Sequence, residues 1–314
     1  MFLRRLTRPV EGPIMAFMKK YKLIANPAAR RGNTQLIISR TLELLAKRGI
    51  AYDLALTAGP KEAGLIARAA CRDYDVIVAI GGDGTVNEVI QGMVFSDTPL
   101  GIIPGGTGND FVRSLRIPNR LEQAVDIVLA GQTRRIDVGK INGTYFANNI
   151  GFGFDAAVNI TTYSMSSNTG GLSLYLRALV RTLGKYRPVQ LAITMNGRTI
   201  DQETFLLSIG NGTTCGGGFK LTPHAKLDDQ LLDVTLLKPL PLASLLWHFP
   251  KVFLGTIDRA SCASLERTTE LTVTSNGPVP IQVDGEIFPG NETNYHVSMI
   301  PRALTVIENP AATP

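Results

Sequence analysis

The feature of the sequence that most constrains the fold is an alternation of short apolar runs with helical patterns between residues 21 and 135. The runs VIVAI (76–80) and LGII (100–103) are apolar at every position, and amphipathic segments such as TQLIISRTLELLAKRG separate runs of this kind. Strands of a parallel sheet that is covered by helices on both faces have this composition. We therefore expect an α/β domain over residues 20–135, with the carboxyl ends of its strands along one edge.

The second half of the sequence has a different texture. Segments such as VQLAITMNG, ELTVTSN and IQVDGEIF alternate polar and apolar residues and contain turn dipeptides. This pattern is typical of antiparallel strands, so we expect a β-rich domain over residues 136–300, interrupted by helical stretches near 155–185 and 241–255. The last apolar run, ALTVIEN, is compatible with a strand within 301–310 that returns to the first domain.

Glycine-rich turns follow two of the apolar strands of the first domain. The turn GGDGT (81–85) comes directly after one strand, and PGGTGND (104–110) contains the turn after the next. Glycines let a ligand approach the backbone, and the amide groups and dipole of a helix start favour a phosphate. Asp83 would repel that phosphate unless Mg²⁺ lies between them. Because both turns end neighbouring parallel strands, we expect them to face one ligand-binding crevice.

Other nucleotide-binding motifs are absent or weak. Neither turn is followed by Gly-Lys-Ser/Thr, and the sequence lacks the His-Arg-Asp catalytic loop of protein kinases. GFGFDA at 151–156 matches a weak dinucleotide pattern, but it lies beyond the alternating domain. No acidic residue follows it at the expected spacing of about 20 residues, so we discard it as a cofactor site.

Positive charge is concentrated at the start of the chain. The first 31 residues contain eight basic residues and one acidic residue, whereas the remainder is nearly neutral and the whole chain has a formal net charge of +6. The basic arm at residues 1–19 suits contact with anionic lipid about as well as it suits a solvated terminus. Nucleic-acid binding needs basic residues spread over a folded face, so we expect no nucleic-acid partner.

The cellular location follows from what the sequence contains. No apolar run approaches the roughly 18 residues of a membrane-spanning helix, and the N-terminus does not resemble a secretory signal. The three cysteines lack the spacing of a metal or redox site, so we expect them to be reduced. We expect a cytoplasmic protein, with Met15 or Met18 as alternative starts.

The sequence resembles the diacylglycerol kinase catalytic-domain family, which includes diacylglycerol, sphingosine and ceramide kinases and bacterial YegS-like lipid kinases. The resemblance runs from Asn26 to Glu286. In order, its motifs are NPAARRG, GGDGTVNEVIQG, PGGTGNDF, NNIGFGFDAAV, GNGTTCGGGFKLTPHAKLDD and VDGE. The first glycine turn alone is also similar to NAD kinases, whereas the whole series is specific to the lipid kinases.

The resemblance implies a fold and a pair of cofactors. The fold is a NAD kinase/diacylglycerol kinase-like α/β nucleotide-binding domain joined to a β-sandwich-type second domain, with the active site in the cleft between them. The cofactors are ATP and Mg²⁺. By motif position, the nucleotide-binding residues are Asn26, Pro27, Thr57, Gly81, Gly82, Asp83, Gly84, Thr85, Asn87, Glu88, Gly106, Thr107, Asn109 and Asp110.

The resemblance also assigns roles in catalysis and metal binding. Glu286 of VDGE is implied to accept the proton of the lipid hydroxyl, with Asp284 and Asp83 as further catalytic residues. A second Mg²⁺ is implied at a turn of the β-rich domain. Its site would be formed by Lys226, Asp229 and Leu231.

The residues themselves support these roles to different degrees. Along one strand, residues 284 and 286 project to the same face, so VDGE would present two carboxylates to a cleft. The alternative is that Asp284-Gly285 is a hairpin turn, for which Asp-Gly is a favoured dipeptide. The motif NPAARRG is longer than the family's usual turn, and the metal turn reads DDQ in place of Asp-Gly. Gln230 is unfavourable there if the position needs a positive φ.

The favoured function is an ATP- and Mg²⁺-dependent lipid kinase that phosphorylates a hydroxyl of a diacylglycerol-like lipid. The alternatives are a soluble-substrate kinase of the NAD kinase type and a nucleotide-binding, membrane-associated protein without turnover. The expected partner is a lipid substrate at a membrane surface, with peripheral attachment of the protein, and a homodimer is left open. The apolar stretches 172–180 and 240–255 either dock on a membrane or, as is commoner, pack against the β-rich domain.

Overall fold

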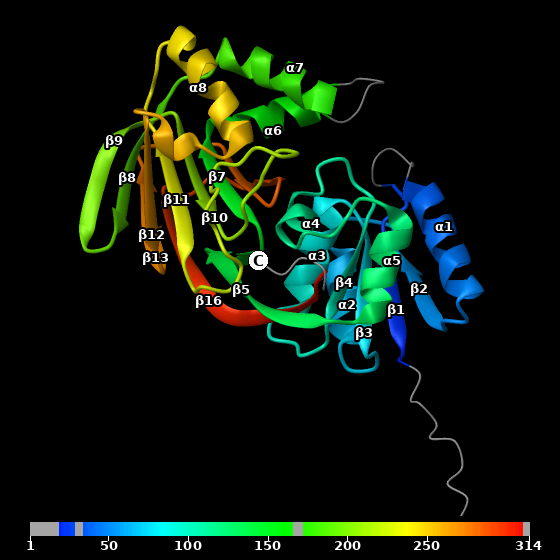
Figure 1. Cartoon of the computed structure of the whole chain (residues 1–314). Helices are drawn as coiled ribbons and strands as arrows, with labels where there is room; N and C mark the ends of the chain where they lie inside the picture. The colour runs from blue at the N-terminus through cyan, green and yellow to red at the C-terminus, as the bar shows by residue number, and fades with distance from the viewer. Residues whose placement is uncertain (1–18, 29–33, 166–171, 310–314) are drawn as a thin grey trace, which may run out of the picture.

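The computed structural model describes residues 19–28, 34–165 and 172–309, which form two domains side by side (Figure 1). The N-terminal arm expected at 1–19 therefore lies almost wholly outside the described residues. The first domain contains a parallel sheet in the order β2-β1-β3-β4. Its strands are β1 (Tyr21–Ala25), β2 (Tyr52–Leu56), β3 (Val76–Gly81) and β4 (Leu100–Pro104).

Helices cover both faces of this parallel sheet. They are α1 (Thr34–Lys47), α2 (Glu62–Ala70), α3 (Asp83–Met93), α4 (Asp110–Ser114) and α5 (Leu121–Ala130). α2 packs against α3, and α1 packs against α5 (Figure 1). β3 and β4 are buried along their whole length, which explains why both are apolar at every position.

The second domain consists of two antiparallel sheets packed face to face. One sheet is formed by β7 (Asn149–Gly153), β10 (Leu206–Gly210), β11 (Leu232–Leu237), β12 (Ala263–Thr268), β14 (Ile281–Val283) and β15 (Glu286–Phe288). The facing layer is formed by β5 (Thr133–Ile141), β6 (Thr144–Phe146), β8 (Val189–Met195), β9 (Arg198–Thr204), β13 (Glu270–Ser275) and β16 (Asn294–Ile307). Side chains such as Phe152, Leu207 and Val273 fill the space between them. The architecture is the β-sandwich type that the resemblance implies.

A continuous sheet joins the two domains. The end of β16 pairs in parallel with β4, and β5 runs antiparallel to β16. The register between β5 and β16 shifts between Ile300 and Leu304, where Arg302 has φ 50°. Such an irregularity bends a strand, so β16 passes from one domain into the other. The strand expected within 301–310 is thus the last part of β16, and β5 begins at Thr133, before the expected domain boundary.

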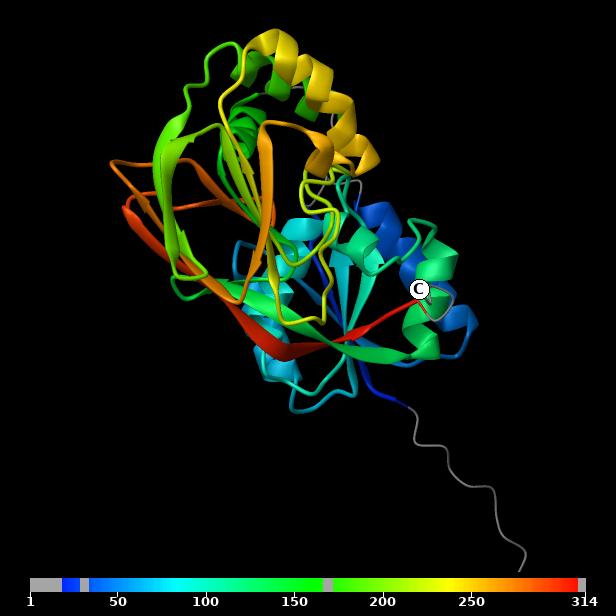
Figure 2. The same cartoon turned by 60° about the vertical axis from the view of Figure 1, so that its left-hand side comes forward.

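Three helices cap the outer face of the sheet that contains β7 and β10 (Figures 1 and 2). They are α6 (Phe154–Ser164), α7 (Leu172–Leu183) and α8 (Leu242–Leu254), and the short 3-10 helix η2 (Ile257–Arg259) follows α8. Phe154, Phe205 and Phe219 belong to the apolar cluster beneath them. No helix in the described part of the chain is long and apolar enough to cross a bilayer.

Candidate active site

The two glycine turns lie against each other at the carboxyl edge of the parallel sheet. The Gly105 amide donates a hydrogen bond to the Gly81 carbonyl at 2.7 Å. A Cβ on Gly106 would lie 2.5 Å from the Gly82 Cα, so the approach of the two backbones leaves no room for a side chain. Both turns therefore open on the same side of the molecule.

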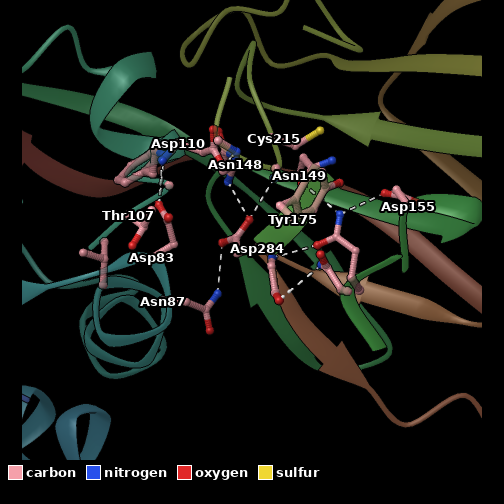
Figure 3. Close-up of a pocket in the computed structure, with 18 of the residues that line it drawn as sticks. Asp83, Asn87, Thr107, Asp110, Asn148, Asn149, Asp155, Tyr175, Cys215 and Asp284 are labelled. Carbon is pink, nitrogen blue, oxygen red and sulfur yellow. Dashed lines mark hydrogen bonds between the residues drawn. The ribbon is translucent and has the colours of Figure 1, made fainter. Parts of the chain in front are cut away.

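Two carboxylates, Asp83 and Asp110, converge beside these turns (Figure 3). Asp83 Oδ1 accepts hydrogen bonds from the backbone amides of Asp110 at 2.8 Å and Phe111 at 3.4 Å. Asp110 Oδ2 accepts a hydrogen bond from the Gly217 amide at 2.8 Å. A Cβ on Gly108 would lie 2.8 Å from Asp83 Oδ2 and 3.3 Å from Asp110 Oδ2, so both carboxylates border the same small space.

The environment of this pair suits a cation. Burial raises the pKa of Asp83, and burial together with the Asp83 charge raises the pKa of Asp110 to about 7. Asp110 Oδ1 is buried and has no hydrogen-bond partner among the residues described. Mg²⁺ is commonly held by one or two carboxylates together with substrate phosphates and water. The pair therefore fits a Mg²⁺ ion that arrives with a nucleotide, although within the described ranges no group of three or more His, Cys, Asp or Glu side chains is placed to hold a metal.

A cavity of about 460 Å³ extends from the carboxylate pair into the space between the two domains (Figure 3). Side chains from both domains line it, and its size is typical of a small-molecule site. The first domain contributes Asp83, Asn87, Thr107 and Asp110. The second domain contributes Asn149, Asp155, Tyr175, Cys215, Gln282 and Asp284. The cavity thus brings Asp284 and four of the predicted nucleotide-binding residues together.

Asp284 and Gly285 form the turn of a hairpin between β14 and β15. Their φ angles are 49° and 88°, and Val283 pairs with Glu286 across the turn. The prediction that residues 284 and 286 share one face of a strand is wrong, because the chain reverses direction between them. The alternative, an Asp-Gly hairpin turn, is correct.

The Asp284 carboxylate holds this hairpin against the first domain. It accepts hydrogen bonds from the backbone amides of Ala147 (2.9 Å), Asn148 (3.0 Å) and Asn149 (2.8 Å). A fourth comes from the Asn87 side-chain amide at 2.9 Å, and Asn87 belongs to α3. Burial raises the pKa of Asp284, and these hydrogen bonds lower it. Asp284 is therefore placed to hold the hairpin in register with α3.

Glu286 leaves the hairpin turn toward the start of α3. A Cβ on Gly84 would lie 2.4 Å from Glu286 Oε1, which places the carboxylate directly against the helix start. Glu286 Oε2 accepts a hydrogen bond from the Tyr163 hydroxyl at 3.2 Å. Partial burial raises the pKa of Glu286, the Tyr163 hydrogen bond lowers it, and the charges of Glu88 and Asp83 raise it. A carboxylate whose pKa is raised in this way is suited to accept a proton.

One face of α6 supports the hairpin that carries Glu286. Asp155, Asn159 and Tyr163 recur at four-residue intervals and so lie on one side of the helix. Asp155 Oδ2 accepts a hydrogen bond from Gln282 Nε2 at 3.2 Å, and the Asn159 side-chain amide donates to the Gly285 carbonyl at 3.3 Å. Sequence reasoning missed this row of contacts. The spacing was visible in FDAAVNITTY, but a polar row on a helix is more often a solvated face.

Asp155 also gives the far end of the cavity an acidic wall (Figure 3). Burial raises its pKa to about 6, and the hydrogen bond from Gln282 lowers it. Asp155 Oδ1 is buried without a hydrogen-bond partner among the described residues. The cavity therefore ends in a polar group at the side opposite Asp83.

The other predicted nucleotide-binding residues lie at the same strand ends but outside the cavity wall. Asn26 follows β1, and the buried Thr57 follows β2. Asn109 Oδ1 accepts the Gly106 amide at 3.0 Å, whereas Glu88 accepts a backbone amide of α2. Their contacts with ATP stay predictions. The predicted residues outside the wall are Asn26, Pro27, Thr57, Gly81, Gly82, Gly84, Thr85, Glu88, Gly106 and Asn109.

The turn predicted to hold a second Mg²⁺ is already in contact with a side-chain cation, Arg267 of β12. Asp229 Oδ2 accepts a hydrogen bond from Arg267 at 3.1 Å, and Asp229 Oδ1 accepts the Leu231 amide at 3.2 Å. Arg267 also pairs with Asp233 at 3.3 Å. The residues therefore do not fit a metal as they are arranged, because the guanidinium already neutralises the carboxylate. The metal site at Lys226, Asp229 and Leu231 stays a prediction, and the contacts of Asp229 argue against it.

Comparisons with known domain families divide the chain in the same way as the fold. Residues 20–141 match the diacylglycerol kinase catalytic domain, and residues 148–308 match the YegS C-terminal NAD kinase beta sandwich-like domain.

Individual relatives cover most of the chain. A diacylglycerol kinase of Bacillus subtilis (strain 168) is 31% identical over 290 residues, which are 89% of this chain and 94% of the relative. A diacylglycerol kinase of Staphylococcus aureus (strain MRSA252) is 31% identical over 283 residues, with 88% and 90% covered. The crystal structure of a diacylglycerol kinase from Bacillus anthracis str. Sterne superposes with a TM-score of 0.77 at 26% identity, covering 94% of this chain and 99% of that one. With its α/β domain, its sandwich and the cleft between them, this chain belongs to the diacylglycerol kinase family and is a lipid kinase.

Proposed function

We propose that this lipid kinase uses Mg²⁺ and ATP to phosphorylate the hydroxyl group of a diacylglycerol-like lipid. The observation that carries the proposal is the contact between Glu286 and the start of α3 at Gly84, beside the two glycine turns. This contact brings a proton acceptor to a helix start, where a phosphate is favoured. The relatives named diacylglycerol kinase support the choice of lipid.

The two domains divide the work of the reaction. We expect the amides of the glycine turns and of the first turn of α3 to bind phosphate oxygens. Mg²⁺, when held by Asp83 and Asp110, supplies positive charge that neutralises those oxygens. Glu286 accepts the proton of the lipid hydroxyl while that oxygen bonds to the γ-phosphorus and the bond between the γ-phosphorus and the departing ADP oxygen breaks. The chemistry requires no covalent enzyme intermediate.

The lipid substrate and the place of action follow from this chemistry. A diacylglycerol-like lipid is dissolved in a bilayer, so we expect the protein to work on a membrane surface, as a peripheral protein on the cytoplasmic side. The absence of a nucleic-acid partner stays a prediction made from the sequence, and the sequence leaves a homodimer open.

The substrate is tested by incubating the protein with labelled ATP, Mg²⁺ and a total lipid extract, followed by mass identification of the product. We expect a labelled phospholipid whose formation requires Mg²⁺. Labelling of NAD but not of lipid would contradict the proposal and indicate a soluble-substrate kinase. No labelled product under conditions where ATP binds would indicate a nucleotide-binding protein without turnover.

The role of Glu286 is tested by Glu286→Gln, which preserves the size of the side chain and removes the proton acceptor. Loss of a general base lowers the rate by about 10²–10⁴-fold. ATP affinity should remain near that of the wild type, because the glycine turns belong to the other domain. The matched control is Glu203→Gln on the exposed surface of β9, which should keep full activity. A Glu286→Gln variant that retains its rate would contradict the assignment.

A further inference from the structure

The outward face of α8 is apolar over its whole length. None of the 13 residues of α8 is buried, yet its inward side chains Leu245, Phe249 and Val252 pack on the apolar cluster of the helical cap. We call the exposed side chains the outward face of α8: Leu242, Ala243, Leu246, Trp247, Pro250, Phe253 and Leu254. None carries a charge, and Trp247 is 78% exposed. Scattered exposed apolar side chains are normal, whereas a contiguous apolar face usually marks an interaction site.

Basic residues are common in the two segments that contain α7 and α8, and we call them the basic border. The segment 172–187, which contains α7, has four basic residues and no acidic residue. The segment 238–259, which contains α8, has three basic residues and one acidic residue, Asp258. α7 and α8 lie together at the same end of the second domain in both views (Figures 1 and 2). The basic residues are Arg177, Arg181, Lys185, Arg187, Lys238, Lys251 and Arg259.

An apolar face with a basic border matches the chemistry of an anionic bilayer. Amphipathic helices that lie in a membrane interface bury an apolar face, often with Trp, Phe and Leu, and their Lys and Arg side chains contact anionic headgroups. A bilayer interior needs no hydrogen-bonding groups from its partner. The outward face of α8 offers only the indole N–H of Trp247, and tryptophan commonly lies where the apolar core of a bilayer meets its wet surface.

Aromatic rings connect the outward face to the cavity between the domains. Tyr175 lines the cavity, and its ring centroid lies 5.4 Å from that of Phe219. Phe219 in turn lies 4.6 Å from Phe253, which belongs to the outward face. The surface that would enter the bilayer and the wall of the cavity are therefore parts of one apolar structure.

We propose that the outward face of α8 docks this kinase on an anionic bilayer, with the basic side chains of α7 against the headgroups. The inference rests on the proposed function, because an enzyme that acts on a membrane lipid must contact the bilayer. Docking in this orientation places the helical cap on the bilayer and keeps the first domain in water.

Trp247 is the sole tryptophan of the chain, so intrinsic fluorescence reports on the outward face directly. The full chain is titrated with vesicles of phosphatidylglycerol and phosphatidylcholine and, separately, with vesicles of phosphatidylcholine alone. We expect the emission to shift to shorter wavelength with the anionic vesicles, and the shift to weaken with salt because screening reduces the attraction of the basic border. An unchanged spectrum together with no sedimentation of protein with anionic vesicles would overturn the proposal.

Matched pairs of leucines locate the docking surface. Leu246 and Leu254 are 59% and 70% exposed on the outward face, and Leu36 and Leu65 are 59% and 70% exposed on α1 and α2. The double variant Leu246→Glu/Leu254→Glu should lower vesicle affinity by about 100-fold, since two buried leucines are lost. Leu36→Glu/Leu65→Glu should bind vesicles like the wild type. Equal losses in both variants, or no loss in either, would place the contact elsewhere.

Matched pairs of arginines test the charged border. Arg177→Ala/Arg181→Ala should lower affinity for anionic vesicles by about 30-fold, given the usual contribution of a basic residue near an anionic surface. Arg40→Ala/Arg68→Ala removes two exposed cations from the first domain and should have little effect. A similar loss in both pairs would indicate attraction to the net charge and would contradict docking through α7 and α8.

Three further outcomes separate docking through α8 from the proposed function and from self-association. Phosphorylation of a dispersed short-chain diacylglycerol by a wild-type protein that does not bind vesicles would overturn docking and leave the proposed function standing. Vesicle binding without phosphorylation of any lipid would overturn the proposed function and leave docking standing. A Trp247 shift that appears with rising protein concentration in the absence of vesicles would show that a second copy covers the face, and would overturn the proposal.

Discussion

Removal of the hydrogen bond from the Tyr163 hydroxyl to Glu286 would test most directly how the proposed base is held in position. The donor and acceptor atoms are 3.2 Å apart, and Tyr163 is in the last turn of α6, two helical turns from Asp155. The change Tyr163→Phe removes only the hydroxyl group and keeps the ring. The variant therefore removes the contact with the carboxylate without removing the ring that lines the cavity.

The size of the effect follows from the exposure of the pair. A hydrogen bond to a charged group contributes about 1.5–3 kcal/mol when it is well buried. Tyr163 is 60% exposed, so water competes for both groups, and we take about 1 kcal/mol for this bond. Loss of that amount from the transition state lowers kcat/KM about fivefold.

The pKa of Glu286 determines the direction in which the kcat/KM profile of Tyr163→Phe should shift with pH. Burial raises the pKa of Glu286, and the hydrogen bond from Tyr163 lowers it because it stabilises the ionised carboxylate. Without the hydroxyl, the pKa of Glu286 rises further, and the acidic limb of the kcat/KM profile moves to higher pH. The loss should therefore be larger on the acidic limb than on the alkaline side, where Glu286 is ionised and only its orientation is impaired.

The assay is kcat/KM for the lipid as a function of pH, for the wild type, Tyr163→Phe and Tyr74→Phe. Tyr74 is the matched control, because its hydroxyl donates to Asp53 at 2.7 Å in the first domain. A Tyr163→Phe profile that coincides with the wild-type and Tyr74→Phe profiles would refute the idea that α6 positions the base.

Gly84→Ala would put a Cβ 2.4 Å from Glu286 Oε1 and displace the carboxylate, so kcat should fall by about 100-fold while ATP affinity, measured by calorimetry, stays within a few-fold. Asp284→Ala strands four hydrogen-bond donors, and urea unfolding should show a loss of about 3 kcal/mol. Arg267→Met leaves the carboxylates of Asp229 and Asp233 without their guanidinium partner. Without nucleotide and under otherwise identical conditions, Mg²⁺ should therefore raise the Tm of this variant more than the Tm of the wild type. Burial and a neighbouring carboxylate raise the pKa of Asp110 to about 7, so the folded state binds more protons than the unfolded state and stability falls as pH rises from about 4 to about 7. Thermal unfolding should show that Mg²⁺ stabilises the protein at pH 8 and has little effect at pH 5, where this carboxyl is protonated.

The nucleotide side of the site could be predicted because its requirements are local. Strands that are apolar at every position must be buried on both faces, and glycine turns at their ends must lie on one edge of a parallel sheet. The close approach of Gly82 and Gly106 agrees with the prediction that the two turns lie together. Gln230 has a φ of 65°, so the position does have the positive φ at which a glutamine was expected to be unfavourable.

The rest of the site depends on contacts between residues that are far apart in the sequence. Arg267 meets Asp229 across 38 residues, and no pattern in the sequence links the two. The α6 row was visible as a spacing of four, but only the folded chain shows that β14 and β15 lie beside it. The sequence VDGE is compatible both with a continuous strand and with a two-residue hairpin turn. The pairing of Val283 with Glu286, which only the structure shows, identifies the turn.

The proposed reaction needs groups from both domains. The first domain carries the carboxyl groups of Asp83 and Asp110, whose negative charges would be neutralised in the proposed reaction by a cation that accompanies the nucleotide. The second domain carries Glu286 on a hairpin whose turn is tied to α3 through Asp284 and Asn87. Because that tie joins the two domains, a change in their separation moves the base relative to the phosphate site. The distance between proton acceptor and nucleotide is therefore set by the packing of the two domains, and the interdomain hydrogen bond of Asp284 is a structural requirement of the proposed chemistry.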